Sequence, residues 1–171
     1  MAGSTPPYGG GMREDETMLR PATENPWYVL MTLYGETEES DLTLHAKNRA
    51  AWNAWACQGL NQKEKQHLSQ QGFTIPNATL WRDEGDSIQA LYRAEMVRRN
   101  PEGFEYPGFP DLGINIEMTR LTFDHDVFAG GFLFPANSTR FLESRFRKVS
   151  FQKAVFTGGA WFERSVFEGI A

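Results

Sequence analysis

Cys57 is the only cysteine in the chain, and two histidines, His45 and His67, lie in the same third of the sequence. A thiol beside an imidazole is the minimum arrangement for a cysteine nucleophile. Cys57, however, stands in a run rich in Ala and Trp, where a cysteine more often serves as a small buried apolar residue. We therefore interpret it as structural, and an enzyme with a site in this N-terminal part is the third of the functions that we consider.

A second candidate for chemistry is the run Asp124, His125 and Asp126, which offers oxygen and imidazole ligands to a metal ion. Adjacent residues at a corner of the chain point in different directions, and no second cluster completes a site. A single cysteine excludes an intramolecular disulfide and a multi-cysteine zinc site. The sequence has no glycine-rich phosphate loop and no nucleophilic serine elbow. We expect no catalytic residue, no metal and no cofactor.

Length and charge narrow the class of protein. The chain has 171 residues, 13% aromatic residues and a formal net charge of −5. This length suits one ordinary domain with a real core, and the overall acidity disfavours general binding to nucleic acid or anionic membranes. The most apolar run, residues 26–34, is far shorter than the roughly 20 residues of a membrane helix. The N-terminus has no basic start followed by an apolar stretch, so we expect a cytoplasmic protein.

The chain divides into three parts by composition. Residues 1–24 are rich in Gly and Pro, carry several acidic side chains and lack apolar periodicity, which predicts a flexible acidic tail. Residues 25–113 have helical spacing of apolar residues and end in a proline-rich linker from about residue 102. Residues 114–171 form the third part, which has a different period.

The helical part is expected to contain three capped helices. Asp41 or Thr43 is placed to cap a helix that ends at Gly59. Asn61 with Glu64 has the spacing of a capping box for a second helix, which Gly72 would end. Residues 73–84 are predicted to be extended. A third helix is expected to start at Asp86 or Ser87 and to end before Asn100–Pro101.

Phenylalanine is concentrated and evenly spaced near the C-terminus. Ten of the 13 phenylalanines lie in the last 51 residues. One series with a step of five residues is Phe141, Phe146, Phe151 and Phe156, which Phe162 and Phe167 continue after one extra residue. An earlier series with the same step is Met118, Phe123, Phe128 and Leu133. This step fits neither one stripe of a helix nor one face of a strand. It requires a chain that turns a corner once per repeat, so that successive turns stack.

The positions around each aromatic residue support the same interpretation. The residue two places before each aromatic is small or β-branched: Thr139, Ser144, Val149, Ala154, Ala160 and Ser165. The remaining positions are mostly polar or charged. A small side chain that shares a crowded axis with a phenylalanine, beside polar neighbours, predicts one buried and one exposed side of each turn.

These motifs resemble those of the pentapeptide-repeat family, and the matching stretches are SRFRK, VSFQK, AVFTG, AWFER and SVFEG. The resemblance spans about residues 116–171. It implies a right-handed quadrilateral β-helix with four repeats per coil, hence two to three coils. The front segments NPWYVLMTLYGE and HAKNRAAWNAW resemble an extension that precedes such repeats in some bacterial proteins. The expected fold class is α+β, with a small helical N-terminal unit that caps a short solenoid.

Three irregular features of this expected solenoid are visible in the sequence. Residues 132–138 (FLFPANS) break the register as a loop or bulge. Gly130–Gly131 and Gly158–Gly159 are interpreted as tight corners that need a positive φ. We expect Trp52, Trp55 and Trp81 to supply the apolar contact of the cap. The sequence stops at Ala171 in mid-repeat, so either the open coil pairs with another copy or the natural chain continues.

A cluster of five cations is the candidate interaction patch: Arg140, Arg145, Arg147, Lys148 and Lys153. With Glu143 it carries a net charge of +4 over fourteen residues, which suits an acidic partner or phosphates, or else a solvated surface. The alternative hypothesis that the resemblance implies is a DNA mimic that targets a topoisomerase, because family members that inhibit type II topoisomerases imitate DNA with acidic faces. This cluster has the opposite sign, which disfavours that alternative. The leading hypothesis is a noncatalytic scaffold that binds a protein, including a second copy through the uncapped coil. Membrane insertion and nucleic-acid binding are not expected.

Overall fold

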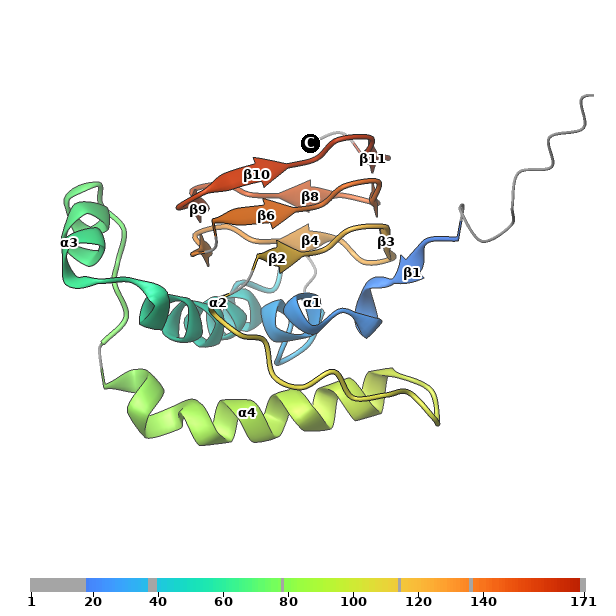
Figure 1. Cartoon of the computed structure of the whole chain (residues 1–171), viewed down its shortest axis with the longest axis horizontal. Helices are drawn as coiled ribbons and strands as arrows, with labels where there is room; N and C mark the ends of the chain where they lie inside the picture. Colours follow the sequence, from blue (N-terminus) through green and yellow to red (C-terminus); the bar gives the residue numbers. More distant parts are fainter. Residues whose placement is uncertain (1–17, 37–39, 78, 114, 136, 170–171) are drawn as a thin grey trace, which may run out of the picture.

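The computed structural model describes residues 18–36, 40–77, 79–113, 115–135 and 137–169. The N-terminal part is helical and the C-terminal part consists of short parallel strands (Figure 1). The helix α4 is outermost, and α1 and α2 lie between it and the strands. In chain order the helical part contains β1 (Arg20–Pro21), the 3₁₀ helix η2 (Ala22–Glu24), α1 (Pro26–Met31), α2 (Leu42–Ala56), the 3₁₀ helix η3 (Cys57–Gly59), α3 (Gln62–Gln70) and α4 (Leu80–Arg99).

Side-chain caps confirm two of the predicted helix starts. The Asp41 carboxylate accepts a hydrogen bond from the Leu44 backbone N–H at 2.9 Å and caps α2. Asn61 and Glu64 form the expected capping box at the start of α3. These contacts satisfy backbone N–H groups that have no partner within the first turn of a helix. The starts of α2 and α3 are therefore set by local chemistry.

The start of α4 differs from the prediction. The sequence predicts an extended segment through residue 84 and a helix start at Asp86 or Ser87, but α4 already begins at Leu80. The Trp81 ring packs against Phe109 with centroids 5.9 Å apart. It also lies over Gly85, where an added Cβ would come within 3.0 Å of the ring. Burial of this ring against a distant segment outweighs the low helix propensity of a glycine.

The end of the segment predicted as a tail is structured. Residues 20–24 form β1 and η2, so the prediction fails for them. The Arg20 backbone N–H donates to the Arg120 carbonyl at 3.0 Å, and Ala22 is buried. The strand β1 forms by pairing with β3, which lies far along the chain, so no local sequence pattern predicts it. Residues 1–17 of the predicted tail lie outside the described residues.

The C-terminal part contains ten short strands among the described residues: β2 (Ile116–Glu117), β3 (Leu121–Phe123), β4 (Val127–Phe128), β5 (Leu133–Phe134), β6 (Ser138–Arg140), β7 (Arg145–Phe146), β8 (Val149–Ser150), β9 (Val155–Phe156), β10 (Gly159–Trp161) and β11 (Val166–Phe167). All pairs are parallel, in the sheet orders β1-β3-β7-β11, β10-β6-β2, β4-β8 and β5-β9. We call β2–β5 the first layer, β6–β9 the second layer and β10–β11 the third layer. In Figure 1 these layers are stacked on the helices.

The register shows how regularly the chain returns to the same sheet. Phe123 of β3 pairs with Phe146 of β7, which in turn pairs with Phe167 of β11. On another sheet Leu133 of β5 pairs with Val155 of β9. The stretch of chain between paired residues is nearly the same in each case, and such a regular return is compatible with a solenoid.

The phenylalanine rings stack between layers as parallel pairs. Phe146 lies between Phe123 and Phe167, with centroid distances of 4.4 and 5.2 Å. Two further parallel pairs are Phe134 with Phe156, at 4.6 Å, and Phe141 with Phe162, at 4.8 Å. In all four pairs the rings are within 7° of parallel. The aromatic series therefore forms the interior of the layers.

The sequence pattern places two members of the earlier series one residue too early. Phe134, and not Leu133, stacks on Phe156. Ala129 is fully buried, whereas Phe128 is only partly buried and lies beneath the ammonium of Lys148 at 5.9 Å. Because strand side chains alternate between two faces, a shift of one residue exchanges the inner and outer positions. Leu133 and Phe134 of β5 pair with Val155 and Phe156 of β9. The break predicted for residues 132–138 therefore lies between β5 and β6.

Residues with a positive φ lie at alternate corners of the layers. Of the two predicted glycine pairs, only Gly131 has a positive φ. Gly131 has a φ of +71°, as expected for a corner glycine. Gly159 instead lies in β10 without a positive φ, and an added Cβ would come within 2.7 Å of the Trp161 ring. Four non-glycine residues adopt the left-handed conformation at the equivalent corners: Arg120, Glu143, Lys153 and Arg164.

Candidate functional site

The helical part closes the outer edge of the first layer. A strand edge carries unpaired N–H and C=O groups, which need partners when they are buried. The Asn25 side chain donates to the Glu117 carbonyl of β2 at 2.8 Å, and β1 pairs with β3. Next to β4, Nε2 of His45 lies 3.1 Å from the Gly130 carbonyl oxygen. Each of these contacts satisfies the edge of a different strand.

Two neighbouring side chains of α2 complete this closure at β5. The Trp52 indole N–H donates to the Leu133 carbonyl at 2.6 Å. The Asn53 side chain accepts from the Leu133 N–H at 2.9 Å and donates to the Gly131 carbonyl at 3.0 Å. The Trp52 ring also packs against rings of the first layer, which confirms it as a capping residue. The other two predicted capping residues contact residues 102–113: Trp55 donates to the Pro110 carbonyl, and Trp81 packs on Phe109.

Cys57 has the environment of a structural thiol. It is buried at the start of η3, and burial raises the pKa of its thiol to about 11. Among the described residues, no hydrogen bond joins Cys57 to His45 or to His67. Burial also lowers the pKa of His45, whose ring stacks on Phe132 with centroids 5.7 Å apart. His45 thus serves the contact between helices and strands, a role that the sequence pattern did not indicate.

Asp124, His125 and Asp126 contact three different groups. Nε2 of His125 lies 3.3 Å from a carboxylate oxygen of Glu36, and Asp126 pairs with Arg147 at 2.8 Å. The Thr122 hydroxyl donates to Asp124. In the part of the chain that the structure describes, no group of three His, Cys, Asp or Glu side chains is placed to hold a metal ion.

Most of the cations predicted as a patch pair with acidic residues of an adjacent layer. Arg140 pairs with Glu117 at 3.1 Å, and Arg147 pairs with Asp126 at 2.8 Å. Arg145 pairs with Glu168. The Lys148 ammonium lies over the Phe128 ring. A local count of charges in residues 140–153 misses these acids, because they belong to the layers above and below.

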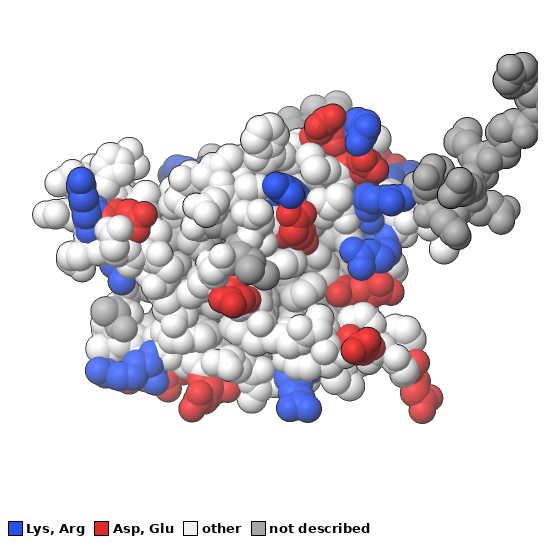
Figure 2. Space-filling model, in the orientation of Figure 1, with Lys and Arg blue, Asp and Glu red and all other residues white. Residues whose placement is uncertain are grey.

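The five cations also lie on several sheets. Arg140 belongs to β6, Arg145 to β7, and Lys153 to the corner before β9. The face of the molecule seen in Figure 2 has Lys and Arg interleaved with Asp and Glu. Three members of the predicted patch, Arg140, Arg145 and Arg147, thus form ion pairs between layers. Lys153 is the one member for which no ion pair or ring contact is found among the described residues.

The outer end of the third layer is the largest exposed apolar feature on the strands. Trp161, Val166 and Phe167 are 54%, 55% and 47% exposed. Phe167 aligns through the second layer with the buried Phe123, whereas Trp161 and Val166 align with Glu117 and Thr122, which are only partly buried. We call these three residues the end surface. Within the described residues, β10 and β11 are the last strands of their sheets, so each has one unpaired edge.

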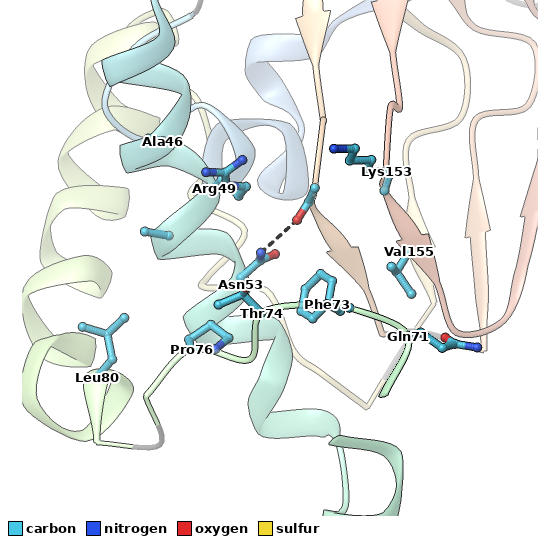
Figure 3. Close-up of a pocket in the computed structure, with 14 residues that line it drawn as sticks. Ala46, Arg49, Asn53, Gln71, Phe73, Thr74, Pro76, Leu80, Lys153 and Val155 are labelled. Carbon is cyan, nitrogen blue, oxygen red and sulfur yellow. Dashed lines mark hydrogen bonds between the residues drawn. The ribbon is translucent and has the colours of Figure 1, made fainter. Parts of the chain in front are cut away.

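A groove of about 920 Å³ lies between α2, the segment that joins α3 to α4, and the corners of the first and second layers (Figure 3). Arg49 and Lys153 lie on it, together with the amides of Asn53 and Gln71. Apolar lining comes from Phe73, Leu80 and Val155. Nothing in the sequence pattern indicated this groove, because its walls come from three separated segments.

Comparison of the chain with known protein families, curated proteins and solved structures gives no match. No helix in the described ranges is long and apolar enough to span a membrane. The geometry of the chain itself must therefore carry the functional argument.

Proposed function

We propose that this chain is a noncatalytic protein-interaction scaffold built on a pentapeptide-repeat β-helix. The regular parallel register and the stacked rings support a right-handed quadrilateral winding, with two full coils and half of a third. The helical part satisfies the strand edges at one end only. The binding function would then belong to the opposite end.

The end surface is the observation that carries this proposal. An exposed strand edge next to exposed apolar side chains readily pairs with another strand. Trp161, Val166 and Phe167 provide the apolar contact, and β10 and β11 provide the backbone groups. We take a second copy of the chain as the partner, because a symmetric pairing of two such ends would satisfy both at once.

The charges of the layers also support protein binding over DNA mimicry. A DNA mimic presents acidic side chains that are free to meet a DNA-binding protein. Here Glu117, Asp126, Glu143 and Glu168 are each engaged by an arginine. The layers therefore lack the continuous acidic face that a mimic requires.

Sedimentation velocity over a range of protein concentrations tests the proposal. The full chain should form dimers as the concentration rises, and Val166→Lys should remain monomeric because it places a charge at the apolar contact. Val97→Lys is the matched control, since Val97 is 65% exposed on α4, away from the end surface. A folded chain that stays monomeric at every concentration contradicts self-association. If Val166→Lys and Val97→Lys weaken the dimer equally, the end surface is not the dimer contact.

A further inference from the structure

The cations on the groove differ from those elsewhere on the layers. Arg120, Arg140, Arg145, Arg147 and Arg164 each pair with an Asp or Glu of a neighbouring layer or corner. Arg49 and Lys153 form no ion pair with any of the described residues. The groove lining also contains no Asp or Glu. A chain with a net charge of −5 thus keeps two uncompensated positive charges on one concave surface.

Backbone geometry brings these two cations together. Gly131 and Lys153 are equivalent corners of the first and second layers, because the strand pairs that flank them, β4 with β8 and β5 with β9, keep the same register. The Arg49 side chain lies over Gly131, where an added Cβ would come within 3.2 Å of its Cδ. Figure 3 shows Arg49 on α2 and Lys153 on the strand side, at the same end of the groove. Two like charges in this position favour a bound anionic group between them.

The rest of the groove suits an extended peptide chain. Phe73, Pro76, Leu80 and Val155 line it away from the cations (Figure 3). The segment of residues 73–77 belongs to no helix or strand, and no hydrogen bond joins the backbone of Thr74 or Ile75 to any other described residue. Backbone groups that have no partner along such a segment can pair with an added strand.

We propose that this groove binds an extended peptide with acidic side chains at one end and apolar side chains next to them. The carboxylates would contact Arg49 and Lys153, and the apolar side chains would pack between Phe73 and Val155. Charge complementarity selects the acidic end, since charge-assisted hydrogen bonds to carboxylates are the strong ones. The groove shares no residue with the end surface, so this proposal does not depend on self-association.

Fluorescence anisotropy with a labelled peptide tests the groove. The probe is the hexapeptide Asp-Glu-Ala-Leu-Ala-Phe, compared with versions in which Lys replaces both acids or Ser replaces Leu and Phe. The full chain should bind the first peptide at least about tenfold more tightly than either control peptide. Binding should weaken as salt is raised from about 50 mM to about 500 mM, because the cations are exposed.

Paired variants locate the binding site. Arg49→Gln with Lys153→Gln should weaken binding at least about tenfold, whereas the control pair Lys63→Gln with Arg82→Gln, which removes the same charge from exposed sites on α3 and α4, should change it less than about twofold. Ala50→Trp should block the groove sterically, and Ala90→Trp, at an exposed site on α4, should not.

The same peptide titration is repeated with the Val166→Lys variant. The test of the groove then stands even if the chain does not associate through the end surface. Absence of binding at millimolar peptide overturns the proposal, as does binding that the Arg49 and Lys153 changes leave intact. Dodecanoate that binds the groove while the peptide does not would identify an acyl anion as the occupant and would also overturn it.

Discussion

The first and third layers are built from the same repeat, yet their surroundings are opposite. In the first layer Ile116, Leu121, Val127 and Phe132 fill the positions two residues before the central side chains, and all are at most 3% exposed. In the third layer the equivalent positions hold Ala160 and Ser165, and Phe167 is half exposed. At these positions, large apolar side chains occur in the layer that the helices cover. Small side chains occur in the third layer, whose outer edge no described residue covers.

This difference shows that capping is a matter of polar contacts as well as apolar area. At the first layer Asn25, His45, Trp52 and Asn53 supply hydrogen bonds to strand backbones. At the third layer Ser165 reaches back to the Phe141 carbonyl, but no described residue covers the outer edge of β10 or β11. The contrast can be tested by removing side chains from each region in turn.

The largest effect is expected from Phe146→Ala. Phe146 is fully buried between two parallel rings, so its loss leaves a cavity that stacking neighbours on both sides cannot fill. The free energy of unfolding should fall by about 3–5 kcal/mol. Urea denaturation followed by tryptophan fluorescence measures this change, and a loss below about 1 kcal/mol would contradict the buried stack.

Asn53→Ala should have the next largest effect. It leaves the Leu133 N–H and the Gly131 carbonyl without their partner on α2. The cost of unsatisfied buried backbone groups predicts a loss of about 2–3 kcal/mol in the same denaturation experiment. Gln89→Ala, at an exposed position of α4, is the control and should be neutral. Equal results for the two alanines would remove the argument for polar capping.

Phe167→Ala sharpens the comparison because Phe167 belongs to the same stack as Phe146. It is 47% exposed and has a parallel ring on one side only. Half of the burial energy of a phenylalanine predicts a loss of about 1 kcal/mol in the dilute monomer. A loss as large as that of Phe146→Ala would show that the third layer is covered in solution.

Arg147→Gln should have the smallest effect. Its partner is Asp126 at 2.8 Å, but the Arg147 side chain is 60% exposed. Exposed ion pairs contribute little, so the stability should change by less than about 1 kcal/mol, and less still in about 0.5 M salt. Thermal denaturation at two salt concentrations checks this, and a large salt-dependent loss would mean that ion pairs between layers hold the strands together.

The sequence predicted those features that repeat or that depend on neighbouring residues. The spacing of Phe141, Phe146, Phe156 and Phe162 indicated the stacked interior, and Asp41 and Asn61 indicated helix starts. The prediction of inner positions was wrong at Phe128 and Leu133, because the first layer contains one extra residue. That extra residue can be located only by aligning the first layer with the second. The prediction of a flexible tail failed at residues 20–24 for a related reason, since β1 forms only by pairing with β3.

The candidate sites were harder to predict than the fold. Local charge pointed to a patch at Arg140, Arg145 and Arg147, but their acidic partners come from other layers. The groove was not predicted at all, because Arg49 and Lys153 belong to distant parts of the sequence. Sites that form between segments become visible only when the register between layers is known.

Residue-resolved amide hydrogen exchange in the dilute chain tests the central claim, that helices close one end of the stacked layers whereas no described residue covers the other end. The N–H of Val155 donates to the Phe132 carbonyl of the first layer at 2.8 Å, and the N–H of Glu168 donates to the Phe146 carbonyl at 2.9 Å. The account predicts that Val155 exchanges at least about tenfold more slowly than Glu168, because the open end unfolds locally. Equal protection of the two amides, or exchange of both at the rate of an unfolded peptide, would contradict it.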